Sequence, residues 1–229
     1  MSVEKAGYLS GPLLTEIESK KLLKEAGIEV VHTVMAGSKK EALRISKEIG
    51  FPVALKIASR DISHKSDIGG VRLGIETANQ AAKAYEDILK AVQQRCPHAA
   101  IEGVSVQKMA PPGVEVIIGT TKDAQFGPVI MFGLGGIFVE IIKDVSFRIV
   151  PIEKRDAREM IREIKGFPLL RGFRGKEPID ITSLEELLLK VSKFAETHPE
   201  IKEIDLNPVF AYPQGAVAVD ARVILESPQ

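Results

Sequence analysis

The sequence predicts an α+β fold of two lobes, and three observations lead to this class. Helical and strand-like segments are mixed over the 229 residues, without the regular strand–helix–strand alternation of a parallel α/β sheet. After Pro97 the chain consists mainly of short segments rich in Val and Ile, separated by Gly and Pro. Near 107–112 a strand-like run ends in Met-Ala-Pro-Pro-Gly. We expect a single unit over 1–229, with one lobe at about 12–108 and the other at about 109–226.

The first half of the chain is expected to contain three helices and three strands. Thr15 and Glu18 form a T-x-x-E capping box and Gly27 supplies a stop, which predicts the first helix. The expected helices cover Glu16 to Ala26, the stretch from the Ser38 cap to Gly50, and a stretch that begins at Asn79. The expected strands cover Ile28 to Met35, Pro52 to Ala58 and Val71 to Glu76.

The second half is expected to be rich in strands, with two helices near its middle. Strands are predicted at Val104 to Met109, Val114 to Thr121, Pro128 to Phe132, Ile137 to Ile142 and Ser146 to Val150. Helices are predicted at Asp156 to Ile164 and at Ser183 to Ala195, the second with a capping box of Thr182 and Glu185. Two strands, Ile201 to Leu206 and Ala216 to Leu225, follow around a Tyr-Pro-Gln-Gly turn.

Charge and cysteine content limit the partners and the compartment. The chain carries 31 Lys plus Arg and 31 Asp plus Glu, so its formal net charge is zero. Because no basic excess or stripe is evident, we expect no nucleic-acid partner. The single cysteine, Cys96, cannot form an internal disulfide and fits a reducing, cytoplasmic location.

The sequence also predicts that the protein has no membrane partner. Residues Met1 to Lys20 lack an apolar core of signal-peptide length. The longest apolar segment, Gly127 to Ile142, is interrupted by glycines and by Glu140. It is also shorter than the ~20 residues that a membrane-spanning helix needs.

Two common nucleotide-binding motifs are absent from the sequence. A Walker A loop is excluded because the only Gly-Lys pair, at Gly175, has Leu170 where the first glycine belongs and Glu177 where Ser or Thr belongs. The run that begins at Gly133 is not a dinucleotide-binding fingerprint, because Phe138 occupies the position of the third glycine. Any nucleotide must therefore be bound by another arrangement.

The segment from Phe51 to Val71 combines residues suited to phosphoryl chemistry. Lys56 lies within an apolar, strand-like run, so it must either extend its ammonium group to solvent or meet an anion. His64 follows in a polar loop, where an imidazole can act as a nucleophile or can simply be solvated. The paired glycines Gly69 and Gly70 would let this loop change conformation. On their own, the two side chains leave both interpretations open.

The C-terminal hairpin offers a candidate magnesium site. Alternate residues of its first strand, ending in Asn207, share one face. If Tyr212 pairs with Gly215, the same register places Asn207 directly opposite Asp220, with Cβ atoms ~4.5–5.5 Å apart. Two hard oxygen donors at that separation suit Mg²⁺. A bulge at Gly215 would turn the two side chains to opposite faces, and such residues can also serve only to solvate the surface.

Taken together, these features resemble the ATP-grasp superfamily. The matching order is helix, strand, helix, Gly-Phe-Pro-Val-x-x-Lys, glycine loop, Val-Gln-Lys-Met, Glu115, Asn-Pro and Asp220. The segments Ser-His-Lys-Ser-Asp-Ile-Gly-Gly-Val and Gly-Leu-Gly-Gly-Ile-Phe-Val-Glu are similar to those of the β subunit of ADP-forming acetyl-CoA (acyl-CoA) synthetases. The resemblance covers essentially the whole chain and implies an ATP-grasp fold with the nucleotide between the lobes.

The resemblance also implies roles for individual residues. His64 matches the family's second phosphorylated histidine, and Lys56 would hold the α- and β-phosphates. The backbone of Gln107, Lys108 and Met109 would receive the adenine edge, and Glu115 would lie near the ribose or the hinge. Asn207 and Asp220 would hold Mg²⁺.

The implied reaction is the reversible conversion of acyl-CoA, ADP and phosphate to free acid, CoA and ATP. An α subunit would carry the CoA site and a first phosphohistidine, in an α2β2 heterotetramer. Alternatives are a stand-alone ATP-grasp carboxylate ligase and a non-catalytic nucleotide-binding module. Carboxylate ligases that form an acyl phosphate directly usually have Asn-x-Arg, whereas Asn207 is followed by Pro208 and Val209, which favours the synthetase type.

Overall fold

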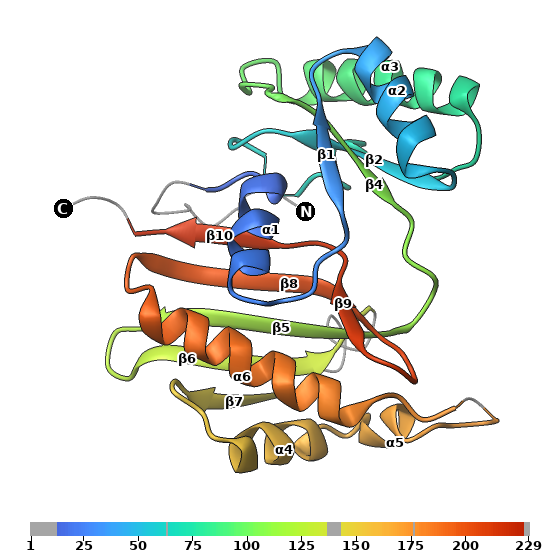
Figure 1. Cartoon of the computed structure of the whole chain (residues 1–229). Helices are drawn as coiled ribbons and strands as arrows, with labels where there is room; N and C mark the ends of the chain where they lie inside the picture. The colour runs from blue at the N-terminus through green and yellow to red at the C-terminus, as the bar shows by residue number, and fades with distance from the viewer. Residues whose placement is uncertain (1–12, 63, 137–142, 176, 227–229) are drawn as a thin grey trace.

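The computed structural model describes residues 13–62, 64–136, 143–175 and 177–226, and it forms two lobes, each with its own sheet (Figure 1). The smaller sheet has four antiparallel strands in the order β1-β4-β2-β3. Its strands are β1 (Thr33–Ala36), β2 (Val53–Ala58), β3 (Val71–Ile75) and β4 (Gly103–Lys108). The helices α2 (Lys39–Ile49) and α3 (Ala78–Arg95) pack on it.

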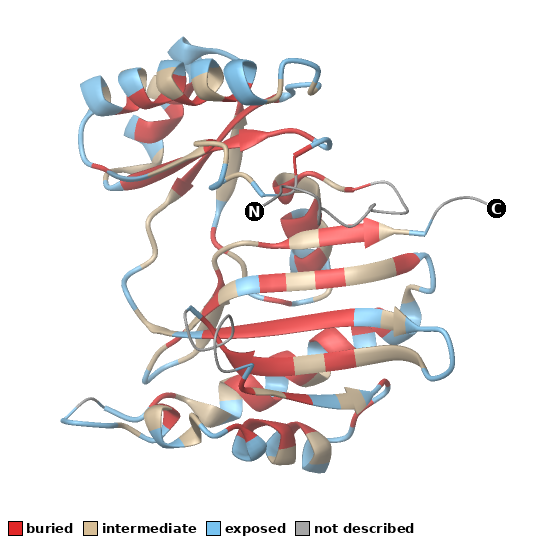
Figure 2. Ribbon diagram, turned by 180° about the vertical axis from the view of Figure 1, so that it is seen from behind, coloured by how far each residue is buried: buried red, intermediate tan, exposed pale blue. Residues whose placement is uncertain are grey.

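The larger sheet has six strands in the order β10-β8-β5-β6-β7, with β9 paired to β8. Its strands are β5 (Val114–Asp123), β6 (Gly127–Leu134), β7 (Val145–Ile149), β8 (Ile201–Ala211), β9 (Ala216–Ala218) and β10 (Arg222–Leu225). The helices of this lobe are α4 (Lys154–Glu163), α5 (Phe167–Leu170) and α6 (Ile181–Thr197). Helices α4 and α6 lie on one face, and the strands lie in front of them when the molecule is turned by 180° (Figure 2). The predicted α+β class is confirmed.

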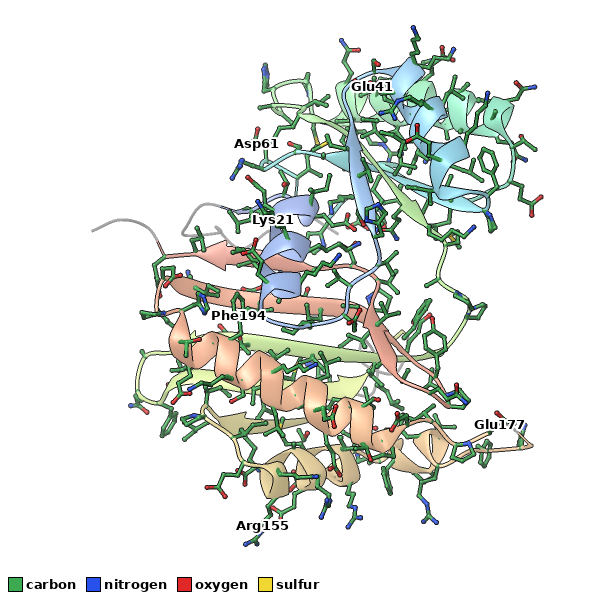
Figure 3. The ribbon with its side chains drawn as sticks, viewed as in Figure 1. Lys21, Glu41, Asp61, Arg155, Glu177 and Phe194 are labelled. Carbon is green, nitrogen blue, oxygen red and sulfur yellow. The ribbon has the colours of Figure 1, made fainter. Side chains whose placement is uncertain are left out.

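Each lobe has a hydrophobic core between its sheet and its helices. In the larger lobe Phe132, Ile118 and Leu188 are completely buried. Phe194 on α6 belongs to the same core, whereas Arg155 on α4 extends into solvent (Figure 3). At ~1.5–3 kcal/mol for each large apolar side chain that is fully buried, these two cores supply the main stabilisation of the lobes.

The capping signals at Thr15 and Ser38 are confirmed, whereas the third helix begins at Ala78 with Thr77 as its N-cap, and not at Asn79. Thr15 caps α1 (Glu16–Glu25) and forms the complete capping box with Glu18. Ser38 caps α2, which ends at Gly50 with a φ of 80°, a left-handed conformation that favours glycine. The side-chain oxygens of Thr15 and Ser38 accept backbone N–H groups of the first helical turn, which have no partner within the helix.

The helix α1 packs on the larger sheet, although the sequence placed it in the first lobe. Leu23 of α1 and Ile28 after it are part of the larger core. Leu14 donates its N–H to the carbonyl of Val223 at 3.0 Å, and Leu13 forms a bridge to Ile224. The segment 13–31 therefore lies with the second lobe, and the chain enters the smaller sheet only at β1 (Figure 1).

Several expected boundaries differ from the structure. The helix expected from Ser183 begins at Ile181 with Asp180 as its N-cap, so the capping box of Thr182 and Glu185 is wrong; Glu185 instead binds Arg158 at 3.0 Å. The strand expected at Ile28 to Met35 forms only as β1, β8 is longer than predicted, and the last expected strand is split into β9 and β10. The expected strand at Ile137 to Ile142 lies outside the described residues.

None of the helices in the described ranges is long and apolar enough to cross a bilayer.

Candidate functional site

A cavity of about 380 Å³ lies between the two lobes. Its walls come from the start of α1, the loop after β2, β8 and the start of β10. Four of the residues on these walls are His64 and Lys65 in the loop, Asn207 on β8 and Asp220 before β10. The fold therefore brings the loop histidine and the hairpin's oxygen donors to one place.

The predicted register of the C-terminal hairpin is confirmed. Tyr212 donates its N–H to the carbonyl of Gly215 at 3.0 Å, with Val209 paired to Ala218 further along the hairpin. The same register continues on β10, where Arg222 pairs with Asp205. Asn207 and Asp220 lie between these two paired stretches and line the same cavity. A bulge at the turn, which would have separated them, does not occur.

Lys56 meets anions instead of reaching solvent. Its side chain, on the central strand β2, is only 5% exposed. The Nζ atom lies 2.9 Å from Oε1 of Glu16 and 3.0 Å from Oδ2 of Asp220. Burial alone would lower the pKa of Lys56, but these two carboxylates outweigh burial and raise it, so the ammonium group stays protonated.

Glu16 connects three lysines, a feature that the sequence analysis missed. Its carboxylate is 3% exposed and contacts the Nζ atoms of Lys20 at 2.7 Å, Lys56 at 2.9 Å and Lys65 at 3.1 Å. Burial would raise the pKa of Glu16, but the three ammonium groups, Lys56 foremost, hold it well below its ordinary value. The spacing of Glu16, Lys20 and the buried Leu23 on one face of α1 was the available signal.

The charges around Glu16 do not cancel completely. Three ammonium groups face two carboxylates, those of Glu16 and Asp220, which leaves one excess positive charge. Burial lowers the pKa of Lys20, and the attraction of Glu16 offsets this only in part. This excess is confined to the Glu16 cluster, because Asp67 and Asp205 add negative charge to the same cavity wall.

His64 is exposed at the cavity wall, and Asp205 on β8 lines the same cavity. The pKa of Asp205 is raised by burial, although Arg222 and the nearby His64 act to lower it. Arg222 lies 3.7 Å from Asp205 and also pairs with Glu203. Its Nε atom is the only buried side-chain nitrogen or oxygen without a partner in the described part of the chain. Asp205 and Arg222 were not predicted as site residues. The available signal was that Asp205 shares a strand face with Asn207, two residues away, and that the predicted register pairs it with Arg222.

The residues expected to bind the base and ribose lie outside this cavity. The Oε1 atom of Gln107 accepts a hydrogen bond from Lys20 at 2.9 Å, which links it to the Glu16 cluster. Lys108 donates to the carbonyl groups that follow α2, at 2.7 and 2.9 Å. The N–H of Met109 donates to Pro52 at 3.1 Å and is therefore already engaged within the first lobe.

Glu115 lies at the start of β5, against the glycine run that follows β6. Its carbonyl oxygen accepts the N–H of Gly135 at 2.8 Å. A Cβ atom at Gly135 would lie 3.0 Å from the Cβ of Glu115, a tighter contact than most such atoms make. The glycine at this position thus permits the close contact, and Glu115 is held apart from the His64 cavity.

The donors that line the cavity fit Mg²⁺ as part of its coordination shell. Asp220 is shared, since its Oδ1 accepts the N–H of Ala221 at 2.9 Å and its Oδ2 contacts Lys56. Among the described residues there is no cluster of three or more His, Cys, Asp or Glu side chains able to hold a metal. Mg²⁺ does not require one, because it commonly takes one or two carboxylates together with phosphates and water. The amide of Asn207 and the carboxylate of Asp220 are donors of this kind.

Comparison with known proteins identifies the family. The ATP-grasp domain family matches residues 10–225. The chain is 51% identical to the β subunit of acetate–CoA ligase [ADP-forming] I from Pyrococcus furiosus, covering 97% of this chain and 96% of that one. It is 49% identical to acetate–CoA ligase [ADP-forming] I of Archaeoglobus fulgidus but spans only 31% of that longer protein.

Solved structures agree with this assignment. Acetyl-coenzyme A synthetase 1 of Candidatus Korarchaeum cryptofilum, in complex with coenzyme A and Ca-AMPCP, has a TM-score of 0.91, 49% identity and 93% coverage of each chain. Another structure of that enzyme, with Mg-AMPPCP, has a TM-score of 0.81 and 45% identity over 93% of each chain. The chain described here belongs to the ATP-grasp family and, within it, to the β subunits of ADP-forming acetate–CoA ligases.

Proposed function

We propose that this chain is the nucleotide-binding β subunit of an ADP-forming acyl-CoA synthetase. The reaction converts acyl-CoA, ADP and phosphate to free acid, CoA and ATP, and is reversible. The observation that carries the proposal is the single cavity in which His64, Asn207 and Asp220 meet, with Lys56 directly behind them. His64 comes from the first lobe and Asn207 and Asp220 come from the second, so the cavity is formed by both lobes.

In the proposed transfer His64 is the catalytic nucleophile. The neutral form of an imidazole carries a lone pair on a ring nitrogen, which can attack phosphorus. A ring nitrogen of His64 forms a bond to the phosphorus of the donor phosphohistidine, whose own N–P bond breaks. A terminal oxygen of ADP then attacks this phosphorus, the N–P bond to His64 breaks, and ATP forms. The ammonium group of Lys56 offsets charge on the phosphates.

Asn207 and Asp220 would hold the Mg²⁺ that accompanies the nucleotide. When bound, Mg²⁺ offsets negative charge on phosphate oxygens. Lys56 would hold the α- and β-phosphates; Glu16 and Asp220 engage two of its three N–H donors. The backbone of Gln107, Lys108 and Met109 is proposed to receive the adenine edge, with Glu115 near the ribose; these four residues do not line the His64 cavity.

The partner of this chain would be an α subunit with the CoA site and the first phosphohistidine. Two relatives support this inference: one is named as a β subunit, and the other is a single polypeptide of which this chain spans about a third. We propose an α2β2 heterotetramer in the cytoplasm, where the lone thiol of Cys96 would remain reduced.

The test is transfer of labelled phosphate to this chain. The chain is mixed with its α subunit and labelled acetyl phosphate, and acid-labile, base-stable label is measured on each polypeptide. We expect label on this chain, its loss in His64→Asn, and its retention in His98→Asn, where the exposed histidine lies away from the cavity. Activity without any α subunit and without label would indicate a stand-alone ligase. Full function of His64→Ala would indicate a module that only binds nucleotide.

A further inference from the structure

The loop that carries His64 is attached to both lobes through the next residue, Lys65. His64, Ser66 and Asp67 are exposed, whereas the side chain of Lys65 is 16% exposed and turns inward. Its Nζ atom lies 3.1 Å from Oε2 of Glu16 and 3.9 Å from Oδ1 of Asp220. Both acceptors belong to the second lobe, so the Lys65 side chain connects the loop of one lobe to the other lobe.

The backbone of Lys65 is attached to β2 as well. Gly70 donates its N–H to the carbonyl of Lys65 at 2.7 Å, and its own carbonyl accepts the N–H of Ile57 at 2.7 Å. A Cβ atom at Gly70 would lie 2.7 Å from Cγ2 of Ile57 and 2.8 Å from the carbonyl oxygen of Lys65. Glycine is therefore needed at 70 for close packing, and the expectation that it serves as a hinge is not supported by these contacts.

Further contacts hold the turn between Lys65 and Gly70. Gly69 donates to the carbonyl of Ser66 at 3.0 Å. Arg95 on α3 donates to the carbonyl of Asp67 at 2.6 Å, and Arg72 on β3 donates to that of Gly69 at 2.9 Å. The turn from Ser66 to Gly70 is thus fastened to the first lobe. On the other side of His64, Arg60 binds Glu18 and Glu102, so Lys65 is the residue directly adjacent to His64 that reaches the second lobe.

We propose that Lys65 is a positioning residue that fixes His64 at the cavity through its ion pair with Glu16. This inference rests on the proposed function and adds a determinant of the phosphoryl-transfer step. Lys65 acts through His64, since its ammonium group is already engaged by Glu16 and Asp220. Loss of Lys65 leaves Glu16 with two ammonium partners, Lys20 and Lys56, so the buried carboxylate stays compensated and the fold is retained.

The test compares Lys65→Met, Lys65→Arg and Lys39→Met. Lys39 forms an exposed ion pair with Glu86 on the far side of the first lobe, so it controls for the loss of a lysine and an ion pair. In the complex with the α subunit, Lys65→Met should slow labelling of His64 by about tenfold to a hundredfold, the effect of losing one charge-assisted hydrogen bond. The ADP affinity, measured by calorimetry, should stay within about threefold. Lys65→Arg should recover much of the rate.

Hydrogen exchange on this chain alone provides a second readout that does not depend on transfer. Lys65→Met should increase amide exchange over 64–70 by about tenfold and leave β5 and β6 unchanged. Should Lys65→Met fail to fold, Lys65→Gln, which loses the charge but keeps a polar end, gives the same two readouts.

The outcomes separate this proposal from the proposed function. Wild-type labelling and unchanged exchange in Lys65→Met would overturn the positioning role. A large loss of ADP affinity with unchanged exchange would also overturn it, because Lys65 would then be a nucleotide ligand. If the wild-type chain takes up no label, the proposed relay fails, and the exchange measurement still decides whether Lys65 fixes the loop.

Discussion

Replacement of Glu16 by Gln should destabilise the protein far more than an ordinary Glu→Gln change. The substitution keeps the size of the side chain but removes the negative charge that faces Lys20, Lys56 and Lys65. Removing one partner from a buried ion pair typically costs about 3–5 kcal/mol, because the remaining charges are left uncompensated. For a chain of this size, about 2–4 °C per kcal/mol gives a fall in Tm of about 6–20 °C.

The assay is thermal and urea unfolding of the wild type and Glu16→Gln as a function of pH. The pKa of Glu16 is lowered from its ordinary 4.5, so its contribution to stability is present above pH 4.5 and is lost as the pH falls below it. The pKa of Lys56 is raised from 10.5, so its contribution is present below pH 10.5 and is lost as the pH rises above it. Glu16→Gln should therefore show a weaker loss of stability in acid than the wild type.

A matched control is Glu48→Gln, which removes an exposed ion pair with Arg44 on α2 and should cost less than about 0.5 kcal/mol. The reasoning would be refuted if Glu16→Gln were as stable as this control near pH 7 and lost stability in acid as steeply as the wild type. The ion pairs of Glu16 with the three lysines would then not stabilise the fold.

Two further changes test the metal donors and the close packing of the His64 loop. Asp220→Asn should weaken Mg²⁺ binding in the presence of ADP by at least about tenfold, because one anionic oxygen donor is lost. Calorimetric titration of Mg²⁺ would measure this, with Asp123→Asn as the control because Asp123 lies at the end of β5 and does not line the cavity. An unaltered affinity in Asp220→Asn would exclude Asp220 as a ligand. Gly70→Ala should cost about 1–3 kcal/mol in urea unfolding, because its Cβ atom would overlap Ile57 and the Lys65 backbone. Gly37→Ala, where a Cβ atom meets only the end of Glu41 at 3.4 Å, should be nearly neutral, and equal costs for the two would contradict this account.

The parts of the fold that depend on residues close together in the sequence could be predicted. The caps at Thr15 and Ser38 were recognised because each pairs a side chain with a backbone group three residues away. The hairpin register followed from the turn between Tyr212 and Gly215, and it placed Asn207 and Asp220 on one cavity. The predicted capping box of Thr182 and Glu185 was wrong for a local reason, because Asp180, two residues before Thr182, caps α6 instead.

Contacts between distant segments could not be predicted in the same way. The partners of Lys56 come from α1 and from the segment before β10, and no periodicity relates them to β2. The paired glycines of the His64 loop were equally ambiguous, because glycine allows either flexibility or close approach. For Gly70 only the position of Ile57 shows that close approach is the reason.

Residue order alone thus determined the helices other than α5, most of the strands, the hairpin register and the family motifs around His64, because each depends on side chains close together along the chain. The folded arrangement decided that α1 packs on the second sheet and that Glu16 binds three lysines beside the cavity. Burial makes those charge pairs strong and their absence costly, and burial exists only once the two lobes are in contact.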